Sequence, residues 1–295
     1  MNPNDRIGKA VSDLKPEEGI VALIVGHPGS GKTSAIASFA SEEEPMYVFD
    51  CDHRIKGMLA CEDWIGDSIK HIDYDQYDVR DGFKEVEAQF NVFYDQYTSR
   101  KLKYKSFLVE SVGSLSRMFL MDSLALKGAK PGMDLSKLKV TKGLNIVGNI
   151  AIPSPDDYKY GSNALHVLFY NFFMAFPKCN IFLSGWTTDR WGKDPNNPNP
   201  YANDILLPGK KLLATNNIAS ELPGYFDEIW EFEKEETGSK SNPVAFKCRF
   251  TSKLAKTCIK ELNKKGEIDF TGKNFKSVFQ ESIKTSRAAT VGERV

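Results

Sequence analysis

A glycine-rich loop directly after a short apolar run is the feature that most constrains this fold. Residues 21–25 (VALIV) are apolar throughout, and the pattern GxxxxGKT occupies 26–33. An apolar run without alternation, closed by glycine, is typical of a buried parallel strand. Glycines let the backbone curl so that successive N–H groups face phosphate oxygens. The segment therefore predicts a strand, a phosphate-binding loop and a helix over 33–40. A chance glycine turn before a helix is disfavoured by this order.

Residue types in the loop predict the ligand. Lys32 is placed to reach the β- and γ-phosphates of a nucleotide, and the Thr33 hydroxyl to ligand Mg²⁺. We expect ATP and Mg²⁺ as cofactors, with His27 and Pro28 serving only to shape the loop. The expected nucleotide-binding residues are Gly26, His27, Pro28, Gly29, Ser30, Gly31, Lys32, Thr33 and Ser34.

Further short apolar runs alternate with helical patterns. Strands are expected at 46–50, 106–110 and 180–184, and helices at 80–100 and 165–176. Parallel strands joined by crossover helices define an α/β fold. Two late strands form an antiparallel hairpin across the turn GSKSNP and are expected at 228–233 and 244–251.

The domain boundaries follow from composition. We expect a polar lead over 1–19, one α/β domain over 20–283 and a flexible tail over 284–295. The Gly-, Pro- and Lys-rich stretch at about 127–161 is interpreted as a mobile insertion. The Pro- and Asn-rich segment 191–202 predicts a second irregular loop.

Bulk composition restricts the partners and the compartment. Net charge is zero, so a nucleic acid could be bound only through a local basic patch. The longest apolar runs fall far below the roughly 20 residues that span a bilayer, and no signal-peptide core is evident. The five cysteines form no C-x-x-C pair. We therefore expect reduced thiols, a cytoplasmic location and no membrane partner.

Carboxylates at strand ends supply candidate catalytic groups beside Lys32. Glu110 closes the strand 106–110 and is expected to hold the water shell of Mg²⁺. Asp50 and Asp52 follow the strand 46–50, where a carboxylate can orient or deprotonate the attacking water. Two alternatives stay open: Glu110 could face solvent, and Asp50 could cap a turn.

The segments GHPGSGKT, VFDCDH and FLVES together resemble the RecA-like branch of the P-loop ATPases. In that family the acid that activates water lies just beyond the second strand, usually as Glu followed by His. Asp52–His53 stands at the matching place, whereas Glu110 departs from the usual Asp. More narrowly, DYKYG at 157–161 and GYFDEIWEF at 224–232 resemble phage-encoded nucleotide-binding ATPases related to single-strand-annealing recombinases. The resemblance covers about residues 20–255.

The resemblance implies further roles. A polar sensor of the γ-phosphate is expected at the end of the fourth strand, where strand-end capping is the alternative. A basic residue is expected to reach the site of a neighbouring subunit in a ring or filament, the alternative being a solvated edge strand. The sensor candidates are Ser184, Thr187 and Thr188; the trans-acting candidates are Lys247 and Arg249, with Lys253 and Lys256 as competitors.

Single-stranded DNA is the partner that the resemblance implies. If the chain is phage-encoded, the expected location is the host cytoplasm. A single-strand-binding or replication protein is expected as a second partner. Basic residues interleaved with aromatics suit single strands. Two other classes remain: a nucleotide switch or loader acting on a protein, and a small-molecule kinase, which the Arg-free loop 191–202 disfavours. The DNA candidates are Arg117, Lys127, Lys130, Lys137, Lys139, Lys142, Arg190, Trp191, Lys193, Tyr201, Lys210 and Lys211.

Overall fold

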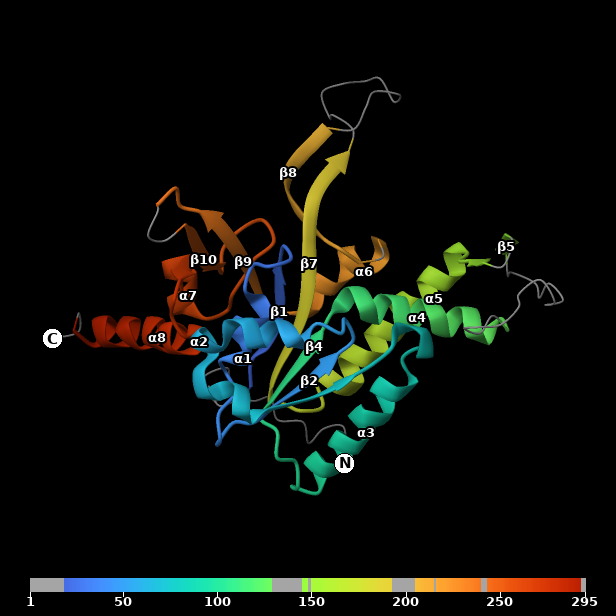
Figure 1. Ribbon diagram of the computed structural model, residues 1–295, viewed down its shortest axis with the longest axis horizontal. Coiled ribbons are helices and arrows are strands. Elements are labelled where there is room, and N and C mark those ends of the chain that lie inside the picture. Colours follow the sequence, from blue (N-terminus) through green and yellow to red (C-terminus); the bar gives the residue numbers. More distant parts are fainter. Residues whose placement is uncertain are drawn as a thin grey trace, which may run out of the picture.

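A computed structural model of the protein describes residues 19–128, 145–147, 150–192, 205–214, 216–239 and 243–292. Within these ranges a nine-stranded sheet forms the centre of the molecule, with helices on both faces (Figure 1). The strand order is β11-β10-β9-β1-β7-β4-β2-β3, and β8 pairs with β7. The expected α/β class, with a mainly parallel sheet and an antiparallel C-terminal hairpin, is confirmed.

The elements have the following bounds. The strands are β1 (Val21–Gly26), β2 (Met46–Asp50), β3 (Ile72–Gln76), β4 (Ser106–Glu110), β5 (Asn145–Val147), β6 (Ile150–Ile152), β7 (Asn180–Gly192), β8 (Ile205–Leu212), β9 (Glu228–Glu236), β10 (Val244–Arg249) and β11 (Glu267–Asp269). The helices are α1 (Lys32–Ala37), α2 (Glu62–Ile65), α3 (Lys84–Thr98), α4 (Val112–Leu126), α5 (Pro155–Leu168), α6 (Asn216–Glu221), α7 (Lys260–Lys265) and α8 (Phe275–Gly292).

Parallel pairing brings the site residues to one edge of the sheet. Strands β9, β1, β7, β4, β2 and β3 all run in the same direction. Their carboxyl ends therefore meet at one edge, which is where ligands bind in open α/β sheets. β7 lies between β1 and β4, so the loop after Gly26 and the carboxylate of Glu110 are separated by one strand.

Alternation along the strands divides the core into two layers. On β1, Leu23 and Val25 belong to the cluster that includes side chains of α3, α4 and α5. Ala22 and Ile24 belong to the cluster that includes side chains of α1, α7 and α8. Because successive strand residues point to opposite faces, one continuous apolar strand supports both layers. The uninterrupted apolar run in the sequence reflects this two-sided burial.

Two segments are more regular than the sequence predicts. Helix α5 begins at Pro155, well before the expected start at 165, and Ser154 and Asp157 form a capping box at its first turn. A short pair, β5 and β6, precedes it. Helix α8 continues to Gly292, through most of the expected tail. Residues 129–144 of the expected insertion lie outside the described residues.

The strand at Asn180 extends far beyond the expected range 180–184. β7 continues to Gly192, and its second half pairs with β8 in an antiparallel ladder. This β7–β8 hairpin projects beyond the body of the sheet (Figure 1). The outer half of β7 contains many polar residues and no apolar run. Hydrophobic periodicity therefore does not predict this part of the strand. The polar edge strand β3 (IDYDQ) escapes sequence prediction for the same reason.

Among the described helices, none is long and apolar enough to cross a membrane. All five cysteines are free thiols, and three of them, Cys51, Cys179 and Cys248, are buried. Burial raises the pKa of Cys179 to about 11, which keeps this thiol protonated at neutral pH.

Phe49 lies at the centre of an aromatic cluster on the α3–α5 face and is fully buried. We expect Phe49→Ala to lower the free energy of unfolding by about 3–5 kcal/mol, through lost burial and the cavity left behind. Tyr74→Ala on the neighbouring strand, where the ring is 48% exposed, should change it by less than about 0.5 kcal/mol. Urea unfolding followed by circular dichroism measures both. Equal losses would contradict the assigned core. The ring neighbours of Phe49 are Tyr47, Tyr77, Phe90, Phe93, Phe107 and Phe172.

Candidate functional site

The glycine loop adopts the backbone conformation that its sequence predicts. Gly26, Gly29 and Gly31 have φ values of +155°, +77° and +83°. A Cβ atom on Gly26 would lie 2.3 Å from the carbonyl oxygen of Phe232 on β9. A Cβ on Gly29 would meet nothing within 4 Å, so positive φ alone explains that glycine. The loop thus curls tightly between β1 and α1.

Helix α1 is shorter than predicted. It covers Lys32–Ala37 rather than 33–40, and turns with i→i+3 bonds such as Ser38 N–H to the Ala35 carbonyl complete the segment. The helix macrodipole sums over aligned peptides, so six residues supply less positive potential than a longer helix. A phosphate bound here would therefore depend mainly on loop N–H groups and on Lys32.

Lys32 is buried inside the loop. Its Nζ donates hydrogen bonds of 3.0 Å to the carbonyl oxygens of Gly26 and His27. Burial lowers the pKa of Lys32 to about 8, while the carboxylates of Glu110 and Asp52 oppose this shift. The ammonium is thus held at the loop and faces two acidic groups.

Glu110 is brought to the loop by β4. Its carboxylate accepts a hydrogen bond of 3.1 Å from the Thr33 hydroxyl and is buried. Burial raises the pKa of Glu110 to about 7; the positive charge of Lys32 lowers it, and the Asp52 carboxylate raises it further. The alternative in which Glu110 faces solvent is therefore wrong. The two residues expected to hold Mg²⁺ lie in direct contact.

Asp50 has a structural task, which corrects its assignment as a catalytic residue. It is fully buried, and its carboxylate accepts bonds from the backbone N–H groups of Arg54 (2.9 Å) and Ile55 (3.1 Å). The Gln76 side-chain amide donates a third bond of 2.9 Å. Asp50 therefore caps the turn after β2, which is the alternative that the sequence left open.

Asp52 keeps one oxygen directed at the site. Its Oδ1 accepts hydrogen bonds from the Ser111 hydroxyl at 3.0 Å and from the Ser114 hydroxyl. Its Oδ2 is buried and has no hydrogen-bond partner among the described residues. The effects of Asp52 on the pKa of Lys32 and of Glu110 place it near both.

A small cavity of about 240 Å³ adjoins Asp52 at the start of α4. Ser111, Ser114, Arg117 and Trp186 line it. The guanidinium of Arg54 lies 4.4 Å from the centroid of the Trp186 ring. Sequence reasoning missed the two serines, whose only signal is the phrase SVGS directly after the strand that ends at Glu110.

The expected sensor residues follow one another along β7. Ser184 and Thr187 are buried, and among the described residues neither hydroxyl makes a hydrogen bond of regular geometry, although Ser184 interacts with the Glu110 carboxylate. Ser184 lies beside Glu110, whose pKa it lowers. Thr188 is less buried and pairs with Lys211 on β8. Of the three, Ser184 is the one in the immediate surroundings of Lys32 and Glu110.

Unpaired polar atoms test whether the site fits a polar ligand. In the described residues, buried side-chain oxygens without a partner occur on Ser30, Asp52, Ser184 and Thr187. Three of these residues belong to the phosphate loop or border Glu110 and Lys32. Buried polar atoms are nearly always hydrogen-bonded in folded proteins, so a polar group is expected here. Phosphate oxygens and the waters around Mg²⁺ suit this donor set.

The trans-acting candidates on β10 are engaged within their own chain. Lys247 pairs with Glu235 at 2.8 Å. Arg249 pairs with Glu233 at 2.9 Å and with Glu235 at 3.2 Å. Reaching a neighbouring subunit would require these ion pairs to open. The competitors Lys253 and Lys256 are exposed.

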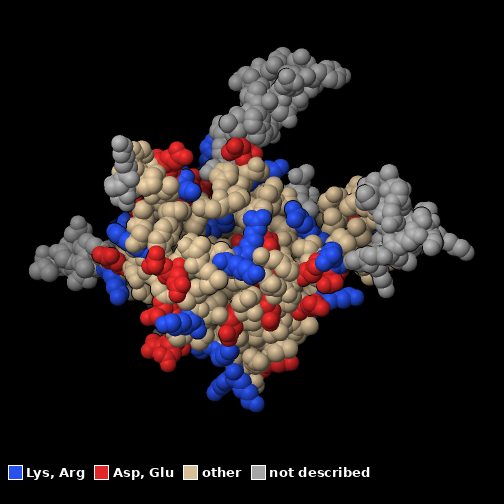
Figure 2. All heavy atoms as spheres, in the orientation of Figure 1, with Lys and Arg blue, Asp and Glu red and all other residues tan. Residues whose placement is uncertain are grey.

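The DNA candidates are only partly described. Arg117 lines the cavity beside Asp52, and Lys127 pairs with Asp157 at 2.7 Å. Arg190, Trp191, Lys210 and Lys211 lie on the β7–β8 hairpin, where the Lys211 side chain is exposed. On the face in Figure 2, basic side chains are interspersed with acidic ones. The candidates outside the described residues are Lys130, Lys137, Lys139, Lys142, Lys193 and Tyr201.

Comparisons with known proteins add little to this geometry. No family model matches the chain, and no curated protein matches it. A solved structure with a similar fold is a prototypical ATPase from the type III secretion system of pathogenic bacteria. The similarity covers 73% of this chain at 11% identity with a TM-score of 0.39, and the chain spans about half of that protein, 52%. Similarity at this level carries no information on activity.

Substitutions of the two aspartates after β2 should affect different properties: stability for Asp50 and hydrolysis for Asp52. We expect Asp50→Ala to lower the free energy of unfolding by about 2–4 kcal/mol, because buried backbone N–H groups lose their acceptor. Asp52→Asn can still accept from both serines and should cost less than about 1 kcal/mol. It should lower kcat for nucleotide hydrolysis by about 10²–10⁴-fold if Asp52 acts on water. Urea unfolding measures the stability of both variants, and steady-state kinetics measures kcat. A large loss of stability in Asp52→Asn together with a loss of kcat alone in Asp50→Ala would overturn both roles.

Affinity for Mg²⁺-nucleotide should rise with pH across neutrality. The pKa of Glu110 is raised to about 7, so its neutral form is favoured below that value and the carboxylate that attracts Mg²⁺ above it. Each pH unit below the pKa should weaken binding by up to about tenfold. Calorimetric titration with a non-hydrolysable nucleotide measures this, with Glu110→Gln as the control. Identical pH profiles for both proteins would show that Glu110 does not titrate.

Proposed function

We propose that the protein binds ATP with Mg²⁺ at the phosphate loop and hydrolyses the bond to the γ-phosphate. The contact between Thr33 and Glu110, beside the buried ammonium of Lys32, carries this proposal. A hydroxyl, a carboxylate and an ammonium at the carboxyl edge of a parallel sheet match the needs of phosphoryl transfer to water.

Each group has a definite task. Loop N–H groups cradle the phosphates, and Lys32 neutralises charge on the β- and γ-phosphates. Thr33 and Glu110, the latter through water, would hold Mg²⁺. The metal, when bound, offsets the charge that develops on the phosphate oxygens. Ser184 lies beside Glu110 and is therefore placed to hydrogen-bond a ligand bound there.

Asp52 orients the attacking water in this proposal. The serine hydroxyls of α4 hold Oδ1, which leaves Oδ2 for the water. A carboxylate so positioned accepts the water proton as the water attacks. Because β4 and α4 supply both Glu110 and the two serines, the metal side and the water side of the site are built on one rigid unit.

We further propose that this ATPase acts on single-stranded DNA, in phage recombination, replication or repair, as a homo-oligomer. The β7–β8 hairpin supports this proposal, because it continues the strand that carries Ser184 and Thr187 and presents the exposed Lys211 (Figure 1). Loss of the γ-phosphate next to Ser184 would thus alter the position of β7, and β7 continues directly into the hairpin. Release of phosphate would then weaken the grip on DNA.

ATP hydrolysis with and without single-stranded DNA tests both proposals. Lys32→Ala should lower hydrolysis by about 10²–10³-fold, because the main positive charge on the phosphates is lost. DNA should stimulate the wild-type protein. Lys211→Glu should remove much of that stimulation, because a phosphate contact becomes a repulsion. Lys178→Glu, an exposed lysine before the other end of β7, is the matched control and should respond like wild type.

Other outcomes would redirect these assignments. Hydrolysis that is indifferent to DNA would favour a switch or loader whose partner is a protein. Phosphoryl transfer to a small acceptor without hydrolysis would mean a kinase. Unchanged hydrolysis in Lys32→Ala would overturn the site itself.

A further inference from the structure

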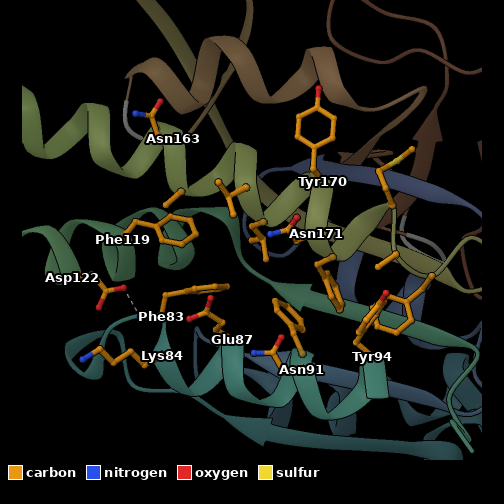
Figure 3. Close-up of a pocket in the computed structure, with 18 of the residues that line it drawn as sticks. Phe83, Lys84, Glu87, Asn91, Tyr94, Phe119, Asp122, Asn163, Tyr170 and Asn171 are labelled. Atoms are coloured by element: carbon orange, nitrogen blue, oxygen red, sulfur yellow. Dashed lines mark hydrogen bonds between the residues drawn. The ribbon is translucent and has the colours of Figure 1, made fainter. Parts of the chain in front are cut away.

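A large hollow of the described structure lies away from the phosphate loop. It is a groove of about 1200 Å³ between α3 on one side and α4, α5 and the turn after α5 on the other (Figure 3). We call it the α3–α5 groove. Its volume exceeds the roughly 300–1,000 Å³ of small-molecule pockets. A polypeptide segment is therefore a better match in size than a metabolite.

The walls of the α3–α5 groove are mainly apolar, with polar side chains such as Glu87, Asn91 and Asn171 between the rings (Figure 3). Phe90 and Phe172 stack at its base with ring centroids 3.5 Å apart. Eleven large apolar side chains are exposed in the described part of the chain, and six of them line this groove: Tyr94, Leu126, Tyr160, Val167, Tyr170 and Met174. Contiguous exposed apolar surface of this kind marks an interaction site.

The chain itself enters the described structure at one end of this groove. The Gly19 N–H donates a hydrogen bond of 2.8 Å to the carbonyl oxygen of Pro177, and Pro177 lines the groove. Ring contacts of Tyr94 and Tyr97 with Phe176 place the C-terminal end of α3 at the same point. The residues before Gly19 are therefore tethered at the mouth of the groove.

The sequence before Gly19 has the pattern of a short amphipathic helix. Ile7, Val11 and Leu14 recur at i, i+4 and i+7, which is one helical face. Asn4 is suited to cap the first turn, and Pro16 ends the pattern. An isolated helix of this length is marginal in water. Its apolar face therefore needs a surface to bind.

The reach of the segment matches the groove. From Phe83 to Tyr97, α3 provides about 21 Å of wall at 1.5 Å per residue. The five Cα–Cα steps from Leu14 to Gly19 extend to at most about 17 Å, and Ile7 lies about 10 Å further along a helix. An apolar face about 10 Å long can thus lie against the groove wall anywhere between its Phe176 end and its Phe83 end.

We propose that residues 5–15 of this same chain bind the α3–α5 groove as an amphipathic helix, with Ile7, Val11 and Leu14 against its aromatic walls. Tethering at Gly19 raises the effective concentration of the segment at its own groove. This favours docking within one chain over capture of a second copy. The contact seals the apolar face of the α/β domain.

Photo-cross-linking in the full-length protein tests this proposal. p-Benzoylphenylalanine replaces Val11 in one variant and Lys9, which faces the opposite side of the helix, in the control. An equimolar mixture of ¹⁴N- and ¹⁵N-labelled chains is irradiated, and cross-linked peptides are mapped by mass spectrometry. We expect position 11 to react with residues 83–97 or 160–177 of the same isotope, at least about fivefold more than position 9 because the two positions point apart.

One variant in the groove and a matched control outside it test whether the cross-link depends on the groove surface. Tyr94→Glu should reduce the cross-link from position 11 by about tenfold, because the charge would be buried under the segment. Tyr74→Glu, at 48% exposure against 46% for Tyr94, should leave it unchanged. Mixed-isotope pairs would assign the groove to a second copy and overturn docking within the chain. Cross-links elsewhere, or equal yields from positions 9 and 11, would also overturn it.

Discussion

The buried hydrogen bond between Thr33 and Glu110, together with the charge of the buried Lys32 ammonium, is the interaction on which the rest of the structure depends. An ammonium and a carboxylate taken out of water are costly unless they lie near opposite charge and hydrogen-bonding groups. Here desolvation raises the pKa of Glu110 to about 7 and lowers that of Lys32 to about 8, while each group partly offsets the shift of the other. Both groups therefore stand near a change of charge at neutral pH. A bound metal–phosphate ligand would supply the missing partners of both.

The sheet topology makes this contact available. β7 separates the strand of the phosphate loop from the strand of Glu110, so a third strand reaches the site and brings Ser184 beside the carboxylate. The same strand continues into the β7–β8 hairpin. The candidate site and a projecting surface are thus linked by one continuous strand, which is the reason for proposing that a partner binds at the hairpin.

The two faces of the sheet differ in how completely they are covered. Helices α1, α7 and α8 close one core layer, whereas α3, α4 and α5 leave an aromatic groove open between them. Phe90 and Phe172 stack in this groove, and within the described residues the large apolar side chains along it, such as Tyr94 and Tyr170, are exposed. The point where the chain enters at Gly19 suggests its own N-terminal residues as the cover.

Local sequence determined the parts that local physics controls. The order of strand, glycine loop and helix, the positions of the apolar strands and the C-terminal hairpin follow from periodicity and glycine placement, whereas the end of the first helix, expected at 40, lies at Ala37. Only the tertiary structure shows what surrounds Asp50 and Asp52: backbone N–H groups and Gln76 for the first, and the serines at the start of α4 for the second. It also decided the ion pairing of Lys247 and Arg249 and the length of β7. These depend on pairing between residues far apart in the chain, and no periodicity in one segment encodes its partner.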